Sequence, residues 1–139
     1  MFIVDSNIWI EVLLRQKRSA EVKEFLNQIP SSEIAMSEFT FGSIGVLLFR
    51  HRAYDAYLAW TDEILIKQKI TRITLQDFQS PFMQEAFRQS LDFDDAYQYV
   101  VAKTENLHLV SFDQDFDKTD LIRLEPLHAI ELWKNQGAV

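Results

Sequence analysis

Short apolar runs alternate with longer amphipathic stretches along almost the whole chain, and this alternation constrains the fold more than any other feature. The runs are brief and rich in Val, Ile and Leu, as buried parallel strands are. Strands that alternate with helices favour a parallel sheet covered by helices on both faces, so we expect an α/β fold. The expected strands are Phe2–Val4, Ile34–Met36, Ile70–Leu75, Leu107–Ser111 and, with a less regular pattern, Leu121–Leu124.

The stretches between these runs have the spacing of helices. The first helix is expected to begin near Ser6 or Asn7, either of which can cap it. The second covers about Ser19–Ile29 and stops at Pro30, because proline cannot continue a helix. Further helices are expected over Glu38–Arg50, Tyr54–Lys67, Gln76–Gln89, Asp92–Glu105 and Leu127–Lys134. No repeat, low-complexity tract or Gly/Pro linker interrupts the chain, which predicts one domain over residues 1–139.

Composition excludes several classes of protein. The chain has no cysteine, which excludes disulfides and thiolate metal sites. Its formal net charge of −7 argues against a module that binds nucleic acid by phosphate neutralisation alone. We see no signal peptide and no apolar run near the roughly 18 residues that a membrane helix needs. We therefore expect a cytoplasmic protein that makes no use of a membrane.

Acidic residues stand at the ends of the expected elements. Asp5 follows the first strand, Glu38 follows the second, and Asp113 follows the fourth. The helix that leads into the fourth strand opens with three aspartates, which are Asp92, Asp94 and Asp95. In a parallel sheet with crossover helices, the carboxyl ends of strands and the amino ends of helices lie on one edge. We therefore expect all four acidic segments to meet there.

Carboxylates held close together repel one another, and some take up protons unless a cation is present. Ligand sets made only of oxygen favour Mg²⁺ or Mn²⁺ over zinc. The three histidines, His51, His108 and His128, are far apart in the sequence and form no ligand pattern. The sequence therefore predicts a carboxylate site for Mg²⁺ or Mn²⁺.

The order of these motifs resembles that of PIN-domain proteins, and in style the VapC-type toxin ribonucleases. The motifs are FIVDSN at the start, an isolated Glu after the second strand, a late helix that begins DDA, and LVSFDQDF. The resemblance spans roughly Met1 to Leu124. It implies a three-layer α/β/α sandwich with strand order 3-2-1-4-5, and metal-dependent cleavage of RNA.

The resemblance also implies which residues form the site. Asp95 is preferred to Asp94 because it immediately precedes Ala96, and Asp113 matches because it comes two residues after Ser111. The expected catalytic and metal-binding residues are Asp5, Glu38, Asp95 and Asp113. The expected supporting residues are Asn7, Ser111, Asp94 and Asp115.

Each acid also has an ordinary structural interpretation. Asp5 can be a strand end beside a helix cap, and Glu38 a first-turn acid stabilised by the helix dipole. Asp92 is interpreted as a cap, and the acids at positions 113 and 115 can belong to a polar turn. Their joint occurrence on one edge, in the order of the family, favours a functional site.

Two other functions remain open. The first is a catalytically silent PIN-like domain used for binding or scaffolding. The second, less favoured, is an aspartate-based phosphatase, which needs a second acid two residues after Asp5, where this chain has Asn7.

The expected partners follow from the resemblance and from the charge. They are an RNA substrate, a small antitoxin that covers the acidic edge with a basic side chain, and a second copy of the chain bound through the helices of Glu38–Lys67. Aromatic residues at helical spacing in this part of the chain are interpreted as core or dimer contacts, and not as platforms for bases. They are Phe39, Phe41, Phe49, Tyr54, Tyr57 and Trp60.

Overall fold

A five-stranded parallel sheet forms the centre of the computed structural model, which describes residues 1–137. Its strand order is β3-β2-β1-β4-β5, and each neighbouring pair is parallel. The strands are β1 (Phe2–Val4), β2 (Ile34–Ser37), β3 (Thr71–Ile73), β4 (His108–Val110) and β5 (Arg123–Leu124). The expected α/β class and the 3-2-1-4-5 order are confirmed.

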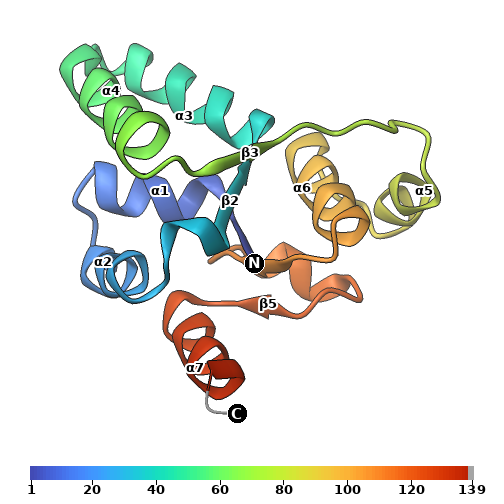
Figure 1. Cartoon of the computed structure of the whole chain (residues 1–139). Helices are drawn as coiled ribbons and strands as arrows, with labels where there is room; N and C mark the ends of the chain where they lie inside the picture. The colour runs from blue at the N-terminus through green and yellow to red at the C-terminus, as the bar shows by residue number, and fades with distance from the viewer. Residues whose placement is uncertain (138–139) are drawn as a thin grey trace.

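Helices cover both faces of this sheet (Figure 1). The α-helices are α1 (Ser6–Leu13), α2 (Ser19–Gln28), α3 (Glu38–Arg50), α4 (Tyr54–Thr61), α5 (Pro81–Arg88), α6 (Phe93–Thr104) and α7 (Pro126–Gly137). Shorter turns of helix are the 3₁₀ segments η1 (Ser31–Glu33) and η3 (Gln114–Lys118), and the π-helical segment η2 (Asp62–Lys67). Within residues 1–137, no helix is long and apolar enough to span a membrane.

The central strand β1 divides the core into two parts, because successive strand residues point to opposite faces. Phe2 and Val4 pack into a cluster with α1, α2, α3 and α7, and Ile3 packs into a second cluster with α5 and α6. These three side chains are at most 1% exposed. Both faces of β1 are therefore buried, and Asp5 directly follows a fully buried strand at the centre of the sheet.

The first helix begins at Ser6 as expected but has a different cap, and another expected helix begins later than the sequence indicates. Ser6 and Asn7 do not cap α1, because the preceding Asp5 takes that position and its side chain accepts a hydrogen bond from the Ser6 backbone N–H. The helix expected over Gln76–Gln89 begins only at Pro81. Proline disfavours helical geometry in the residue before it, so Ser80 is extended and caps the helix instead.

Two other elements are shorter than the sequence indicates. The helix expected over Tyr54–Lys67 divides into α4 and the π-helical segment η2. The strand expected over Ile70–Leu75 shrinks to β3, where Thr71 and Arg72 are exposed. This strand lies at the edge of the sheet, where one side has no strand partner among the described residues, so an apolar pattern is not required there.

Candidate metal centre at the carboxyl edge of the sheet

Asp5 is fixed at the end of β1 by both its backbone and its side chain. Its N–H donates to the Val110 carbonyl of β4 at 3.0 Å. Its carboxylate accepts hydrogen bonds from the Ser6 N–H at 2.7 Å, the Asn7 amide at 3.1 Å and the Ser111 hydroxyl at 2.7 Å. Burial nevertheless raises the pKa of Asp5, because desolvation of the charged form outweighs these donors.

Asn7 and Ser111 join β1, α1 and the end of β4 in one polar network. The fully buried Ser111 hydroxyl donates to Asp5 and accepts from the Asn7 amide at 3.0 Å and from the Asp113 N–H at 2.9 Å. The Asn7 carbonyl oxygen accepts from the Phe112 N–H at 3.0 Å. The hydroxyl therefore uses its one donor and both acceptor positions. The network sets the distance between Asp5 and the chain that follows β4.

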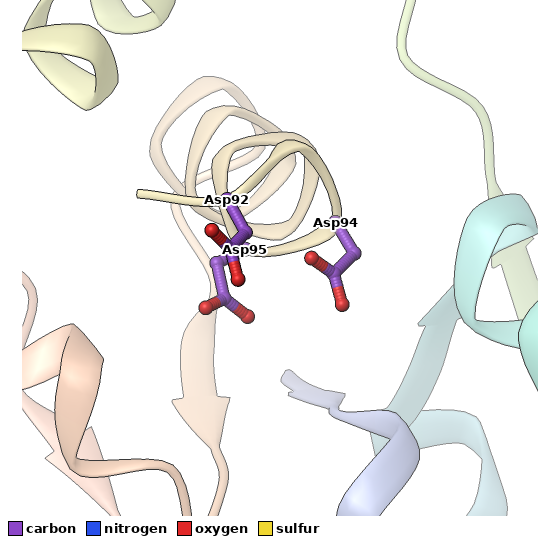
Figure 2. Close-up of side chains that lie close together, drawn as sticks. All are labelled: Asp92, Asp94 and Asp95. Carbon is purple, nitrogen blue, oxygen red and sulfur yellow. The ribbon is translucent and has the colours of Figure 1, made fainter. Parts of the chain in front are cut away.

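The start of α6 brings three aspartates to the same edge. Figure 2 shows the side chains of Asp92, Asp94 and Asp95 extending from the first turn of this helix toward the same side. Each offers a carboxylate oxygen within 4.8 Å of the other two. Asp95 is only 8% exposed, whereas the other two are exposed. Asp95 is thus the buried member of this group, and Asp92 and Asp94 are its solvent-exposed members.

Asp95 also belongs to a second group, with Asp113 and Asp115, whose oxygens again lie within 4.8 Å of one another. Burial, followed by the negative charges of Asp113 and Asp94, raises the pKa of Asp95 to about 7. Within residues 1–137, no backbone or side-chain donor forms a hydrogen bond to its carboxylate. Asp95 therefore lacks the protein donors that hold Asp5.

Asp113 and Asp115 occupy the turn after β4. Asp113 caps η3, and its carboxylate accepts from the Asp115 N–H at 2.9 Å. Asp115 is exposed and lies 4.0 Å from the Lys118 ammonium. Asp113 thus faces Asp95 from a fixed turn, and Asp115 lies at the outer end of the group.

Glu38 lies to one side of these groups. It is the first residue of α3, and its carboxylate lies 3.5 Å from the Arg72 guanidinium of β3. Neither of the two groups of acids found in residues 1–137 includes it. The two groups thus bring Asp94, Asp95, Asp113 and Asp115 together. Asp5 belongs to neither group, but it lies near enough for its negative charge to help raise the pKa of Asp95. Glu38 is paired with Arg72 instead.

Two features of the site were not predicted from the sequence. Asp92 occupies the N-cap position of α6, as the sequence predicts, but its side chain forms no cap hydrogen bond and lies with Asp94 and Asp95 instead. Its spacing from Asp95 was the available signal, because the N-cap and the third helical residue lie side by side.

The second feature is a buried polar contact between α3 and α6. The Ser37 hydroxyl donates to Thr40 at 3.1 Å, and the Thr40 hydroxyl donates to the Gln98 side-chain oxygen at 3.4 Å. All three residues are at most 4% exposed. The contact sets the amino end of α3, which carries Glu38, against α6. Its signal in the sequence is a glutamine within the apolar stretch Tyr97–Ala102.

The donor set fits Mg²⁺ or Mn²⁺. Every candidate ligand is a carboxylate, and hard divalent cations prefer oxygen ligands. A buried carboxylate that is surrounded by like charges and has no protein donor is stabilised by a bound cation. Asp95 meets this description, and the aspartates around it supply the remaining oxygens.

Comparisons with known proteins show that the fold is shared with solved structures. Among curated proteins, no sequence matches the chain. The structure of FitAcB from Neisseria gonorrhoeae is similar, with a TM-score of 0.76 and 16% identity over 92% of this chain and 99% of that one. The structure of the Mycobacterium tuberculosis toxin VapC20, which cleaves the sarcin-ricin loop, has a TM-score of 0.71 and 18% identity. The match covers 91% of this chain and 100% of that one. A toxin–antitoxin complex from Klebsiella pneumoniae has a TM-score of 0.71 and 20% identity, and the match covers 91% of this chain and 98% of that one.

These structures share the fold with the chain, and their low identities carry no more than the fold. The family is shown by the sequence itself, because the family model described as "PIN domain" matches residues 2–122. That range contains all the strands but β5 and every candidate ligand described above. The chain belongs to the PIN domain family.

Proposed function

We propose that this chain is a divalent-metal-dependent ribonuclease of the VapC toxin type, which hydrolyses phosphodiester bonds in RNA. The observation that supports it most is the buried Asp95 carboxylate, which has no protein donor among the described residues and has aspartates on both sides. The similarity to a sarcin-ricin loop cleaving toxin and to a toxin–antitoxin complex adds to it.

Each acid has a role in the proposed reaction. Bound Mg²⁺ or Mn²⁺ would lower the pKa of the attacking water and stabilise negative charge on the leaving oxygen. Asp5 and Asp95 are the first candidates for ligands, and Asp113 completes the shell or orients the water. Glu38 is proposed for the same role, which requires it to leave its contact with Arg72. Asn7 and Ser111 act through Asp5, because their hydrogen bonds hold its carboxylate in one orientation. The supporting acids Asp94 and Asp115 raise the negative potential that attracts the cation.

Asp5→Asn tests this proposal most directly. The variant removes one charge and keeps the shape of the side chain, so the circular dichroism spectrum should be unchanged. Cleavage of RNA in Mg²⁺ or Mn²⁺ should be lost in this variant, and wild-type cleavage should be lost in EDTA. The matched control is Asp55→Asn, at an exposed acid in the first turn of α4, which should cleave as the wild type does. Full activity of Asp5→Asn, or full activity in EDTA, would refute the mechanism.

The two alternative functions have different requirements. A catalytically silent domain needs no metal, so calorimetry that detects no binding at millimolar Mg²⁺ or Mn²⁺ would favour it. An aspartate-based phosphatase needs an acid at position 7. The Asn7 amide instead donates to Asp5 and Ser111, and its oxygen accepts from the Phe112 N–H. An amide that donates both of its N–H groups to neighbours cannot act as the acid that phosphatase chemistry needs, so generic phosphoesters should not be hydrolysed.

The proposed partners are a small antitoxin and a second copy of the chain. One similar structure is a toxin–antitoxin complex, and another is FitAB bound to a DNA fragment. A chain of net charge −7 suits a partner that brings a basic side chain to the acidic edge. For the homodimer we propose the α3–α4 surface, where apolar side chains are more than half exposed. These are Val46, Phe49 and Leu58, with Ile66 of η2 beside them. The proposed setting of these contacts is the cytoplasm.

A further inference from the structure

Four aromatic rings gather beside the acidic groups, from three separate parts of the chain. Tyr97 of α6 lies at their centre and is 6% exposed. Its ring centroid is 5.5 Å from that of Phe39 in α3, and 6.3 Å from those of Phe78 and Phe93. The Phe39 and Phe93 rings also contact each other, at 5.5 Å and an angle of 69°. These four rings are linked by pairwise contacts through the buried Tyr97, and we call them the aromatic cluster.

The outer rings of the aromatic cluster face solvent. Phe93 is 58% exposed and Phe78 is 55% exposed, although a phenylalanine ring gains free energy when it is buried. Phe93 contacts Phe39 at 69° and Tyr97 at 66°, so neither neighbour stacks in parallel on its ring. Phe93 thus has room for a flat partner.

The first turn of α6 carries both the exposed ring and the acidic group. Phe93 lies between Asp92 and Asp94 in the sequence, and consecutive Cα atoms are about 3.8 Å apart. Phe39 directly follows Glu38. Because a base is joined to its phosphate through a single ribose, a nucleotide whose phosphate lies at these carboxylates has its base within reach of these rings.

The cluster is also held in place. Tyr97 is fixed by its hydroxyl, which accepts a hydrogen bond from the Leu75 N–H at 2.8 Å. Phe93 is the first residue of α6, and the backbone there is fixed by the Ala96 N–H, which donates to the Asp92 carbonyl at 2.8 Å. A platform fixed before binding loses little conformational entropy when a base stacks on it.

We propose that Phe93, supported by Phe39 and Tyr97, is a stacking subsite for the base next to the phosphate that is hydrolysed. The proposal rests on the ribonuclease function above and assigns residues that position its substrate. An acidic chain cannot hold RNA by phosphate neutralisation alone, and stacking on a neutral ring supplies affinity without positive charge. Because any base has a flat face, this subsite favours an unstacked nucleotide and does not select its identity.

The test measures binding separately from cleavage. Asp5→Asn protein in Mg²⁺ is titrated with unstructured oligo-uridine carrying one 2-aminopurine, placed at each position in turn. Anisotropy of an end label gives the affinity, and quenching of 2-aminopurine reports stacking. Adding Phe93→Ala should weaken binding roughly 5- to 150-fold and remove the quenching, as expected for the loss of one stacked base. With Phe93→Trp in place of Phe93→Ala, the affinity and the quenching should return to those of the parent. With Phe93→Leu, which keeps apolar volume but has no ring, both should stay as low as with Phe93→Ala.

Ile122→Ala is the control, because Ile122 is 80% exposed and precedes β5, at the amino edge of the sheet and away from the acidic groups. It should bind as the parent does. Equal affinity and equal quenching with and without Phe93→Ala would overturn the subsite, and so would the absence of RNA binding by the parent. If Phe93→Ala instead weakens self-association in light scattering and leaves RNA binding unchanged, the ring belongs to a protein interface and the proposal is wrong. Cleavage by the wild type tests the ribonuclease function independently, so the two proposals can fail separately.

Discussion

Replacing Asp95 with asparagine should stabilise the metal-free protein at pH 8. Burial and the nearby aspartates raise the pKa of Asp95 to about 7 in the folded chain, against 3.8 for a free aspartate. The folded state therefore holds a proton that the unfolded state has lost between these two values. The stability associated with this proton is complete below about pH 4, and it is lost as the pH rises to about 7.

The size of the effect follows from the same shift. The difference between a pKa of about 7 and one of 3.8 corresponds to about 4 kcal/mol. Asp92 and Asp94 are exposed, and solvent and salt screen their part of the repulsion. We therefore expect Asp95→Asn to raise the free energy of unfolding by about 1–3 kcal/mol at pH 8, and by much less at pH 4.

Equilibrium unfolding in urea, at both pH values and in EDTA, measures this difference. Adding Mg²⁺ should stabilise the wild type through preferential binding to the folded state and should stabilise Asp95→Asn much less. Asp55→Asn is again the control, and its effect should not change with pH in this way. If Asp95→Asn is no more stable than the wild type at pH 8, Asp95 is not an ionised and uncompensated group, and its selection as a metal ligand loses its physical basis.

Two further predictions concern the hydrogen bonds that support the site. Ser111→Ala removes the donor to Asp5 and the acceptor for the Asp113 N–H, so it should lower the free energy of unfolding by about 1–3 kcal/mol and abolish RNA cleavage. Urea unfolding measures the loss, with the exposed Ser32→Ala as the control, and an unchanged midpoint would contradict the network. Tyr97→Phe leaves the Leu75 N–H without its partner, so hydrogen exchange at this amide should accelerate and stability should fall by about 1–2 kcal/mol. If the Leu75 amide exchanges as slowly in Tyr97→Phe as in the wild type, the Tyr97 hydroxyl does not anchor the segment that follows β3.

The sequence predicts best where local and tertiary requirements coincide. The helix expected over Glu38–Arg50 has the same limits as α3, because Ser37 caps one end and the apolar positions of one face contact the core. The helix expected from Gln76 fails for the opposite reason. Residues 76–80 carry the chain across from β3 to α5, and the Leu75 N–H is taken by Tyr97. No local pattern encodes a hydrogen bond to a side chain 22 positions away.

The candidate site, like the helices, was predicted only in part from the sequence. Strand polarity places every acidic segment on one edge. Asp95 and Asp113 do lie together there, and the charge of Asp5 acts on Asp95 from the end of β1. The sequence predicts Asn7 and Ser111 as supporting residues, but it does not predict which groups their side chains bond to. These hydrogen bonds depend on the register in which Val4 pairs with Val110, and this register brings the residues after β1 beside those after β4.

Strand order, and not polarity, decides how far apart the acids lie along the edge. Strands β2 and β4 flank β1 on opposite sides, and neighbouring strands are about 4.8 Å apart, so these two ends are separated by roughly 10 Å. Asp113 follows β4 on the side of Asp95, and Glu38 follows β2 on the side of Arg72. After burial, the groups that raise the pKa of Asp95 are Asp113, Asp94, Asp5 and Asp92. Because Arg72 offsets the charge of Glu38, the repulsion that a cation would relieve is concentrated around Asp95.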